Sequence, residues 1–267
     1  HVKGGGSSGQ SKTGSNGGEG VIGLYCQIIP MRSTMILADR NTAERRDMLD
    51  GGTGLTRDVP LEPGCSALLI VDVQNYCCDR TGGEFRDLNE DQFEARYGNY
   101  FRRLESETIP NLQVVIGACR AAGVEVIYTV IEALTSDGRD RGLDYKITGF
   151  LVPKGSRDGR VIDAIQPGED EIVFPKSASS VFNSTNIEYV LRNLGVERLA
   201  ICGVYTEQCV ESAVRDACDR GFLVTVVADA CATPVLSMHD NSLIAIKGYC
   251  RTIQTQKLIK ELREIFS

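Results

Sequence analysis

Short apolar runs that alternate with helical segments constrain the fold of this chain more than any other feature of its sequence. The runs are rich in β-branched residues, as buried strands are, and the segments between them carry apolar residues at helical spacing. The predicted strands are residues 67–73, 124–130, 171–174, 198–202 and 223–229, with a short sixth strand at 251–253. The predicted helices are residues 97–122 (with a break at Pro110 left open), 186–194, 210–220, 237–248 and 255–265. This alternation predicts a three-layer α/β/α, Rossmann-like fold, in which helices cover both faces of an about six-stranded, mainly parallel sheet.

Composition divides the chain into three regions. Residues 1–20 are almost all small, polar or charged, which is typical of a low-complexity tail. Residues 21–60 form an N-terminal extension of mixed composition, whose apolar run at 21–29 is too short to cross a membrane. From residue 61 to residue 267 the pattern is continuous, and its length fits one α/β domain. Within it, the stretch 134–168 is expected to be a long excursion with a short helix, serving as a lid or an oligomer contact.

Charge and cysteine usage exclude several classes of function. The formal net charge is −7 and no basic run is present, which argues against a nucleic-acid partner. The chain has ten cysteines but no Cys-x-x-Cys pair, so zinc-ribbon and thioredoxin-type sites are excluded. Several cysteines stand in apolar stretches, as buried thiols do, and we expect a reducing, cytoplasmic location. Only two histidines occur, His1 and His239, which leaves little for a histidine-based metal site.

Three chemically useful side chains lie at the ends of predicted strands. Asp72 lies near the end of the first strand, Lys176 just after the third, and Cys209 just after the fourth, at the turn into a helix. At a helix N-terminus the unpaired N–H groups and the helix dipole favour a thiolate. Because functional groups of parallel sheets gather at the carboxyl ends of the strands, we expect all three in one cleft.

Together these groups can cleave an amide through a thioester intermediate. Cys209 would attack the carbonyl carbon, and Asp72 would take the thiol proton and pass it to the leaving amine. Lys176 would keep Asp72 ionised and help to lower the pKa of the thiol. The backbone N–H groups of Tyr205 and Cys209 would bind the oxyanion. Each residue alone has an ordinary interpretation as well: a turn cap, a loop lysine and a core cysteine.

In three segments the chain resembles the isochorismatase-like cysteine hydrolases. Residues 69–75 are similar to the family's motif with the catalytic aspartate, residues 174–185 to the motif with the catalytic lysine, and residues 203–210 to the motif with the nucleophilic cysteine. The resemblance spans roughly residues 61–266, and three motifs in order at family spacing are a specific signal. It implies a cis peptide bond before Tyr205, which would turn the Tyr205 N–H towards the oxyanion, and assembly as a homodimer or homotetramer.

The resemblance also narrows the reaction. Nicotinamidases bind a metal through histidines, and no histidine lies between His1 and His239, so we expect neither a metal nor another cofactor. Isochorismatases typically lack the cysteine, because vinyl-ether hydrolysis uses no thiol, and Cys209 argues against that reaction. The run from Asp72 to Asn75 and the later Gly82-Gly83 pair are most similar to the ureidoacrylate and biuret or N-carbamoyl amidohydrolases. The implied partner is a small linear amide, ureide or N-carbamoyl compound.

The residues that would contact this substrate are less closely defined. Gln74 and Asn75 could hydrogen-bond a ureido group, or they could cap the turn after the first strand. Tyr205 and Phe182 could line the pocket, with core packing as the alternative for Phe182. A substrate carboxylate could pair with a basic side chain, or these side chains could be ordinary surface charges; the candidates are Arg80, Lys146 and Arg157.

Two other functions remain in competition with the amidohydrolase. One is a vinyl-ether hydrolase of the isochorismatase type, and the other is a non-catalytic binding protein on the same fold. A nucleotide-binding dehydrogenase is disfavoured, because no Gly-x-Gly-x-x-Gly follows the first strand.

Overall fold

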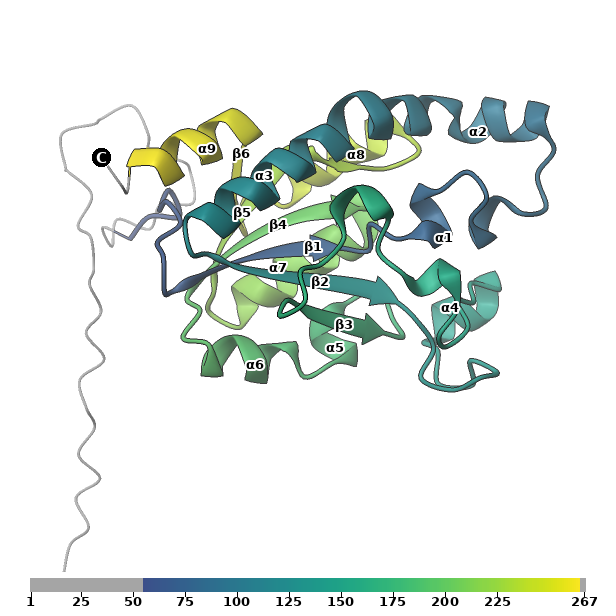
Figure 1. Ribbon diagram of the computed structural model, residues 1–267, viewed down its shortest axis with the longest axis horizontal. Coiled ribbons are helices and arrows are strands. Elements are labelled where there is room, and N and C mark those ends of the chain that lie inside the picture. Colours follow the sequence, from purple (N-terminus) through teal and green to yellow (C-terminus); the bar gives the residue numbers. More distant parts are fainter. Residues whose placement is uncertain (1–54, 265–267) are drawn as a thin grey trace, which may run out of the picture. The chain divides into compact units, whose positions relative to one another are not determined.

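The computed structural model describes residues 55–264 (Figure 1). The predicted tail at 1–20 and most of the extension at 21–60 lie outside the described residues. The described part contains a six-stranded sheet in the order β3-β2-β1-β4-β5-β6, and every strand pair in it is parallel. The strands are β1 (Ser66–Val71), β2 (Glu125–Ile131), β3 (Ile172–Lys176), β4 (Arg198–Val204), β5 (Leu223–Ala232) and β6 (Arg251–Ile253). The predicted three-layer fold is therefore confirmed.

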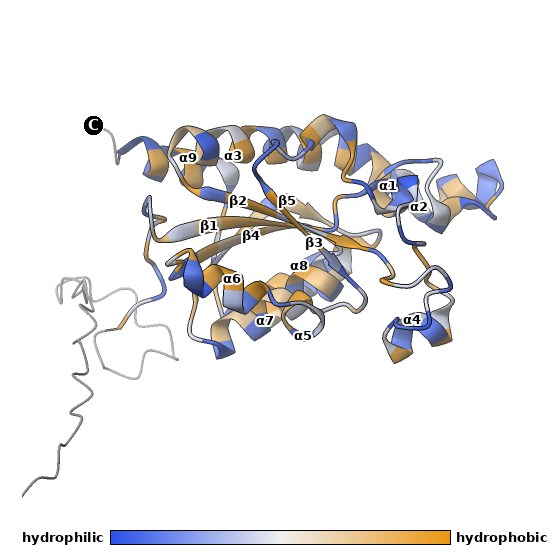
Figure 2. Ribbon diagram, turned by 60° about the horizontal axis from the view of Figure 1, so that its bottom comes forward, coloured by the Kyte–Doolittle hydropathy of each residue, from blue (hydrophilic) through white to orange (hydrophobic). Residues whose placement is uncertain are grey.

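Helices cover both faces of the sheet. The helices are α1 (Asn75–Cys78), α2 (Glu90–Arg103), α3 (Ile109–Ala121), α4 (Leu143–Thr148), α5 (Val181–Ser184), α6 (Ile187–Asn193), α7 (Glu211–Asp219), α8 (Leu236–Ala245) and α9 (Thr255–Glu264). Helices α3 and α9 lie on one face, and α5, α6 and α7 lie on the other (Figures 1 and 2). The short helix expected within 134–168 is α4.

The long helix predicted at 97–122 differs from the structure. It begins earlier, as α2, and is joined to α3 by a π-helical segment, Leu104–Thr108. Pro110 stands in the first turn of α3, where its missing N–H needs no partner within the helix. The proline therefore marks the start of a helix at this point, and the chain stays helical through it.

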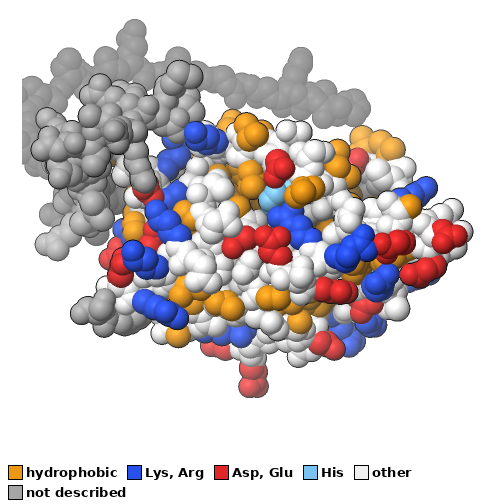
Figure 3. Space-filling view, turned by 90° about the horizontal axis from the view of Figure 1, so that it is seen from above, with side chains coloured by type: hydrophobic (Ala, Val, Ile, Leu, Met, Phe, Trp, Pro, Cys, Tyr) orange, Lys and Arg blue, Asp and Glu red, His pale blue; other side chains and the backbone are white. Residues whose placement is uncertain are grey.

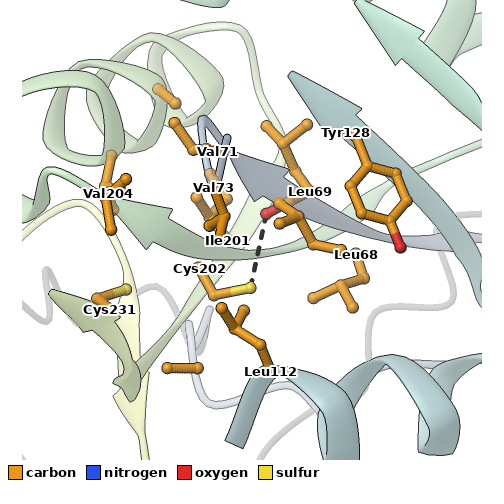
Figure 4. Close-up of a cluster of buried hydrophobic side chains, with 14 of the residues drawn as sticks. Leu68, Leu69, Val71, Val73, Leu112, Tyr128, Ile201, Cys202, Val204 and Cys231 are labelled. Atoms are coloured by element: carbon orange, nitrogen blue, oxygen red, sulfur yellow. Dashed lines mark hydrogen bonds between the residues drawn. The ribbon is translucent and has the colours of Figure 1, made fainter. Parts of the chain in front are cut away.

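The strands form the core between the two helical layers. In Figure 2 the central strands are coloured mainly hydrophobic, and every residue of β1 is buried. Figure 4 shows Leu69, Ile201 and Leu112, from β1, β4 and α3, in one cluster with Cys202, whose thiol lies 3.9 Å from the Leu69 carbonyl oxygen. Fully burying one leucine or isoleucine contributes about 1.5–3 kcal/mol, so this cluster holds the sheet against α3.

The strand order reverses between β1 and β4, and this point places the functional groups. Strands β2 and β3 extend from β1 to one side, and β5 and β6 extend from β4 to the other. In sheets of this kind ligands bind beyond the carboxyl ends of the strands at the switch point. Here β4 carries Gly203 at φ 121°, and an added Cβ would collide with the backbone of Val71. Only glycine allows β1 and β4 to approach so closely at this position.

One face of the molecule carries charges of both signs. The face seen from above in Figure 3 has acidic and basic side chains interspersed with apolar ones. Within residues 55–264 no helix is both long and apolar enough to cross a membrane.

Candidate active site

Asp72, Lys176 and Cys209 meet at the carboxyl edge of the sheet. Lys176 ends β3, and its Nζ lies 2.7 Å from Asp72 Oδ2 and 3.3 Å from Cys209 Sγ. A third contact, 2.9 Å long, joins Nζ to the carbonyl oxygen of Ala178. The ammonium group thus makes two hydrogen bonds and one ion pair. The exposed fractions of Asp72, Lys176 and Cys209 are 1%, 0% and 4%, so the lysine links acid and thiol away from water.

Both oxygens of the Asp72 carboxylate are held in place. The Thr129 hydroxyl donates to Oδ1 at 2.7 Å, while Oδ2 faces Lys176. The Asp72 N–H donates to the Thr129 carbonyl oxygen at 3.1 Å. The backbone of Asp72 is left-handed, with φ 54°, a region in which aspartate is one of the few non-glycine residues found regularly. Such a conformation persists where the surroundings impose it, and here it turns the carboxylate out of the strand towards the thiol and the lysine.

Burial sets the protonation of the nucleophile. It raises the pKa of the Cys209 thiol to about 12; the Lys176 ammonium acts to lower it, and the Asp72 carboxylate adds to the rise. Burial also opposes the charge of Lys176, but Asp72 and Cys209 outweigh it and raise the pKa of the lysine above its usual value. The resting site is therefore a neutral thiol beside an ion pair. The sequence suggested that the turn favours a thiolate, and the structure differs because desolvation outweighs the helix N-terminus and the lysine.

The turn that carries Cys209 is the one implied by the family resemblance. The Val204–Tyr205 peptide bond is cis. Residues Thr206–Val210 form a π-helical segment that continues directly into α7, so Cys209 lies inside the first turn of a helical stretch. The N–H groups of Tyr205 and Cys209 belong to this turn, and their oxyanion role stays a prediction.

A small cavity adjoins the three groups. Its volume is about 20 Å³, enough for about one water molecule. It is lined by Asp72, Cys77, Ile131, Tyr145, Phe150, Val204, Tyr205, Gln208 and Cys209. The wall made by Tyr145 and Phe150 comes from the excursion between β2 and β3, and their rings stack with centroids 5.0 Å apart. Neither residue was expected in the pocket from the sequence, and the signal that points to them is aromatic residues within a long excursion that leads into Lys176.

Gln74 and Asn75, the polar residues that follow Asp72, have side-chain amides that are bonded to the backbone and do not line this cavity. Gln74 is fully buried, and its amide nitrogen donates to the carbonyl oxygens of Ile131 and Asp158, each at 2.9 Å. Its amide oxygen accepts from the Ile131 N–H at 2.6 Å. The Asn75 side chain donates to a backbone carbonyl 3.0 Å away. The buried Gln74 amide is thus bonded to backbone groups of β2 and of the excursion, which corrects its expected substrate contact, and Asn75 does not line the cavity.

Of the two aromatic residues expected in the pocket, only Tyr205 lines it. Phe182 packs instead on Phe222, with ring centroids 6.1 Å apart, and the core-packing alternative applies to it. The basic candidates also lie elsewhere: Arg80 stacks over the Phe93 ring, and Arg157 pairs with Asp79 at 2.6 Å. Among residues 55–264, no arginine or lysine lines the cavity.

His239, for which the sequence predicts no chemical role, supports the turn that carries the nucleophile. Its Nε2 lies 3.1 Å from Arg103 Nη2, and its Nδ1 lies 2.9 Å from Thr206 Oγ1. A guanidinium only donates, so we assign Nε2 as the acceptor and place the proton on Nδ1, which donates to Thr206. Burial, together with the charge of Arg103, lowers the pKa of His239 to about 4 and keeps the ring neutral. The Ser242 hydroxyl also contacts the Thr206 carbonyl oxygen at 3.3 Å, so α8 holds the first residue of the turn twice.

The carboxyl of Glu84 lies behind the cavity and should make stability depend on pH. The Tyr205 hydroxyl donates to Glu84 Oε2 at 2.8 Å. Burial raises the pKa of Glu84 from 4.5 to about 7. The folded state therefore binds this proton more tightly than the unfolded chain, and the stabilisation is complete below pH 4.5 and lost as pH rises to about 7. The loss is about 3 kcal/mol of unfolding free energy.

The measurement is urea unfolding of the wild type and the Glu84→Gln variant between pH 4 and pH 8. We expect the variant to lack this fall in stability, while Glu90→Gln, at an exposed position, keeps it. Identical pH dependence in wild type and Glu84→Gln would show that the carboxyl does not titrate in this range.

Within residues 55–264, no group of three or more His, Cys, Asp or Glu side chains is arranged to hold a metal ion. The expectation that the site works without a cofactor stays a prediction.

Comparisons with known proteins identify the relatives of this chain. The isochorismatase domain model matches residues 66–257. The ureidoacrylate amidohydrolase RutB of Agrobacterium fabrum is 30% identical over 196 residues, which cover 64% of this chain and 78% of that protein. Nicotinamidase 3 of Arabidopsis thaliana is 30% identical over 169 residues, which cover 61% of this chain and 84% of that protein.

Solved structures agree on the fold. A cysteine hydrolase from Pseudomonas syringae pv. phaseolicola superimposes with a TM-score of 0.66 at 24% identity, covering 78% of this chain and 96% of the other. The N-carbamoylsarcosine amidase from Thermoplasma acidophilum superimposes with a TM-score of 0.56 at 23% identity, covering 72% of this chain and 96% of the other.

Proposed function

Because this chain belongs to the isochorismatase family of hydrolases, we propose that it is a metal-independent cysteine amidohydrolase. It cleaves a C–N bond of a small linear amide, ureide or N-carbamoyl compound through a thioester. The observation that carries the proposal is the contact of Lys176 with both Asp72 and Cys209, because it joins a nucleophile and a proton acceptor in one buried group.

In the first half of the reaction the thiol proton passes to Asp72 as Cys209 Sγ bonds to the substrate carbonyl carbon. The carbonyl oxygen becomes an oxyanion and is bound by the N–H groups of Tyr205 and Cys209; one such donor typically contributes about 10²–10³ in turnover. Asp72 then gives the proton to the leaving nitrogen, and the C–N bond breaks to leave a thioester. Lys176 stays protonated throughout and offsets the negative charge as it moves between carboxylate and sulfur.

In the second half Asp72 takes a proton from the water molecule that attacks the thioester. The C–S bond breaks, and the proton returns to sulfur to restore the neutral thiol. This cycle suits a thiol whose pKa is raised to about 12, since the proton leaves only as attack proceeds.

The relatives support the choice of bond. The ureidoacrylate amidohydrolases, at 29–31% identity, and the N-carbamoylsarcosine amidase on the same fold are named for ureido or carbamoyl substrates. A cavity of about 20 Å³ holds about one water molecule, so the wall from the excursion has to move for such a substrate to enter. A lid role for 134–168 is thus part of the proposal.

The proposal also includes an oligomeric state and a cellular location for the protein. The family resemblance supports a homodimer or homotetramer. All nine cysteines of the described residues are free thiols, which supports a reducing, cytoplasmic location.

The test is a panel of ureides, N-carbamoyl amines, simple amides, nicotinamide and isochorismate, with ammonia and pyruvate as readouts, before and after treatment with a chelator. We expect at least one ureide or N-carbamoyl compound to be turned over at least about tenfold faster than nicotinamide, with no effect of the chelator. Turnover of isochorismate alone would favour the vinyl-ether hydrolase, and no turnover with an inert Cys209 would favour the binding protein.

A further inference from the structure

The excursion between β2 and β3 brings a phenol to the nucleophile. Tyr145 lies on α4, and its hydroxyl oxygen is 3.9 Å from Cys209 Sγ. Helix α4 has six residues, of which Tyr145 is buried at 5% exposure while Leu143 and Ile147 are each 74% exposed. The helix therefore directs one aromatic side chain inward, to the sulfur, and its other large apolar side chains outward.

Tyr145 is held in this position by contacts on several sides. The Arg141 guanidinium donates to the carbonyl oxygens of Gly138, at 2.9 Å, and Phe150, at 2.6 Å, and so closes the excursion around the tyrosine. The Phe150 ring stacks on Tyr145 and also packs on Tyr76, with ring centroids 4.4 Å apart. Residues of both the excursion and α1 thus hold the Tyr145 side chain in place.

The excursion is also tied to the strand that carries the lysine. The Gly142 N–H, at the start of α4, donates to the Ser177 carbonyl oxygen at 2.8 Å. Ser177 follows Lys176 directly, so this hydrogen bond joins the peptide that begins α4 to the residue next to the lysine that contacts Sγ. Lys176 and Tyr145 therefore contact the sulfur from two neighbouring segments, the end of β3 and helix α4.

A second donor to sulfur would stabilise the charge that develops during the reaction. When the thiol proton moves to Asp72, the S–H bond breaks, an O–H bond forms, and negative charge develops on a buried sulfur whose charged donor is Lys176. Burial raises the pKa of Tyr145 above its usual value, so its hydroxyl is protonated near neutral pH. A neutral hydroxyl beside an anion donates its hydrogen, and such charge-assisted bonds are about twice as strong as neutral ones.

We propose that Tyr145 is a catalytic residue, whose hydroxyl donates a hydrogen bond to the Cys209 sulfur as the thiolate forms. The inference rests on the proposed function, from which it takes the nucleophile. The Tyr145 O–H bond stays intact, so no further acid or base enters the proton balance. Because the donor lies on the excursion, the sulfur gains its full reactivity only while α4 is seated against the cavity.

The test compares the reactivity of two thiols that share one cavity. Cys77 lines the same cavity as Cys209, and within residues 55–264 no hydrogen bond joins it to Tyr145. Its alkylation rate follows access of the reagent and its own ionisation, whereas the rate at Cys209 also follows any hydrogen bond from Tyr145. The full chain and its Tyr145→Phe variant are treated with iodoacetamide between pH 7 and pH 9.5, and alkylation of each thiol is followed by peptide mass spectrometry. We expect the ratio of Cys209 to Cys77 alkylation rates to fall about tenfold in the variant at every pH, as loss of one hydrogen bond to a charged group predicts.

A matched control removes a buried hydroxyl at a distance from the site. Tyr128 on β2 is fully buried, and its hydroxyl contacts Arg120 at 3.2 Å. The Tyr128→Phe variant should keep the wild-type alkylation ratio, and thermal unfolding of both variants shows whether each is folded. With a substrate from the panel, Tyr145→Phe should lower kcat about tenfold or more and change KM by less than about threefold.

The outcomes separate this inference from the proposed function. The ratio needs no substrate, so an unchanged ratio in Tyr145→Phe overturns the role of Tyr145 even if the amidohydrolase activity is found. A ratio that falls equally in Tyr128→Phe also overturns it, because the effect is then a general loosening of the core. Failure of the whole panel, with the ratio reduced as expected, overturns the proposed function and leaves the hydrogen bond to sulfur in place.

Discussion

Replacing Cys209 by alanine should abolish hydrolysis of every amide or ureide that the wild-type protein turns over. The thiol supplies the atom that bonds to the carbonyl carbon, and neither Asp72 nor Lys176 can take its place. Removing the nucleophile from a catalytic group that acts as a unit typically lowers kcat by about 10⁴-fold or more. The measurement is ammonia release with the substrate identified by the panel, together with mass spectrometry of the intact protein during turnover. The wild type should carry an acyl adduct on Cys209, and the variant should carry none.

The control for this prediction is another cysteine. Cys218 lies on α7 and is half-buried, so Cys218→Ala removes a thiol without touching the site and should keep wild-type turnover. Equal turnover by the wild type and Cys209→Ala would eliminate the thioester mechanism, and it would favour chemistry of the vinyl-ether type, which needs no thiol.

The proximity of Asp72, Lys176 and Cys209 was predictable because the strands of a parallel sheet all run in the same direction. Once the apolar runs are assigned to parallel strands, all their carboxyl ends lie at one edge, and residues that end three strands have to lie near one another. The sequence could not show how deeply they are buried. Burial decides that the thiol is neutral, and it depends on the packing of α4, α8 and the turn over the strand ends.

The side chains that complete the cavity could not be placed from the sequence. A strand alternates its side chains between two faces, but the left-handed backbone at Asp72 breaks that alternation, so the pattern does not orient Gln74 or Asn75. Tyr145 and Phe150 lie in an excursion without periodicity, and tertiary contacts fix their direction: the hydrogen bonds of Arg141 to nearby carbonyl oxygens and the packing of Phe150 on Tyr76. Sequence motifs and hydrophobic periodicity predict which residues lie at the ends of the strands. Tertiary contacts decide which other residues lie opposite these strand ends.

The Lys176→Met variant should be both inactive and markedly less stable than the wild type. Methionine retains most of the length of the side chain but leaves the Asp72 carboxylate at 1% exposure without its cation. Removing one partner of a buried ion pair costs about 3–5 kcal/mol of unfolding free energy, because the other charge is left uncompensated. In a domain of this size that corresponds to a fall in Tm of roughly 10 °C. Calorimetry measures the change, and Lys260→Met, at a 77% exposed position with an ion pair 3.8 Å long, should change Tm by less than about 2 °C.

A double variant separates lost charge from lost packing. Adding Asp72→Asn to Lys176→Met removes the orphaned carboxylate, while the amide oxygen can still accept the hydrogen bond from Thr129. If the uncompensated charge causes the instability, the double variant should be more stable than Lys176→Met alone, by about 2 kcal/mol or more. A double variant no more stable than the single one would assign the cost to the packing of the lysine side chain. Turnover should stay absent in both, because a restored fold returns neither the proton acceptor nor the cation beside Cys209.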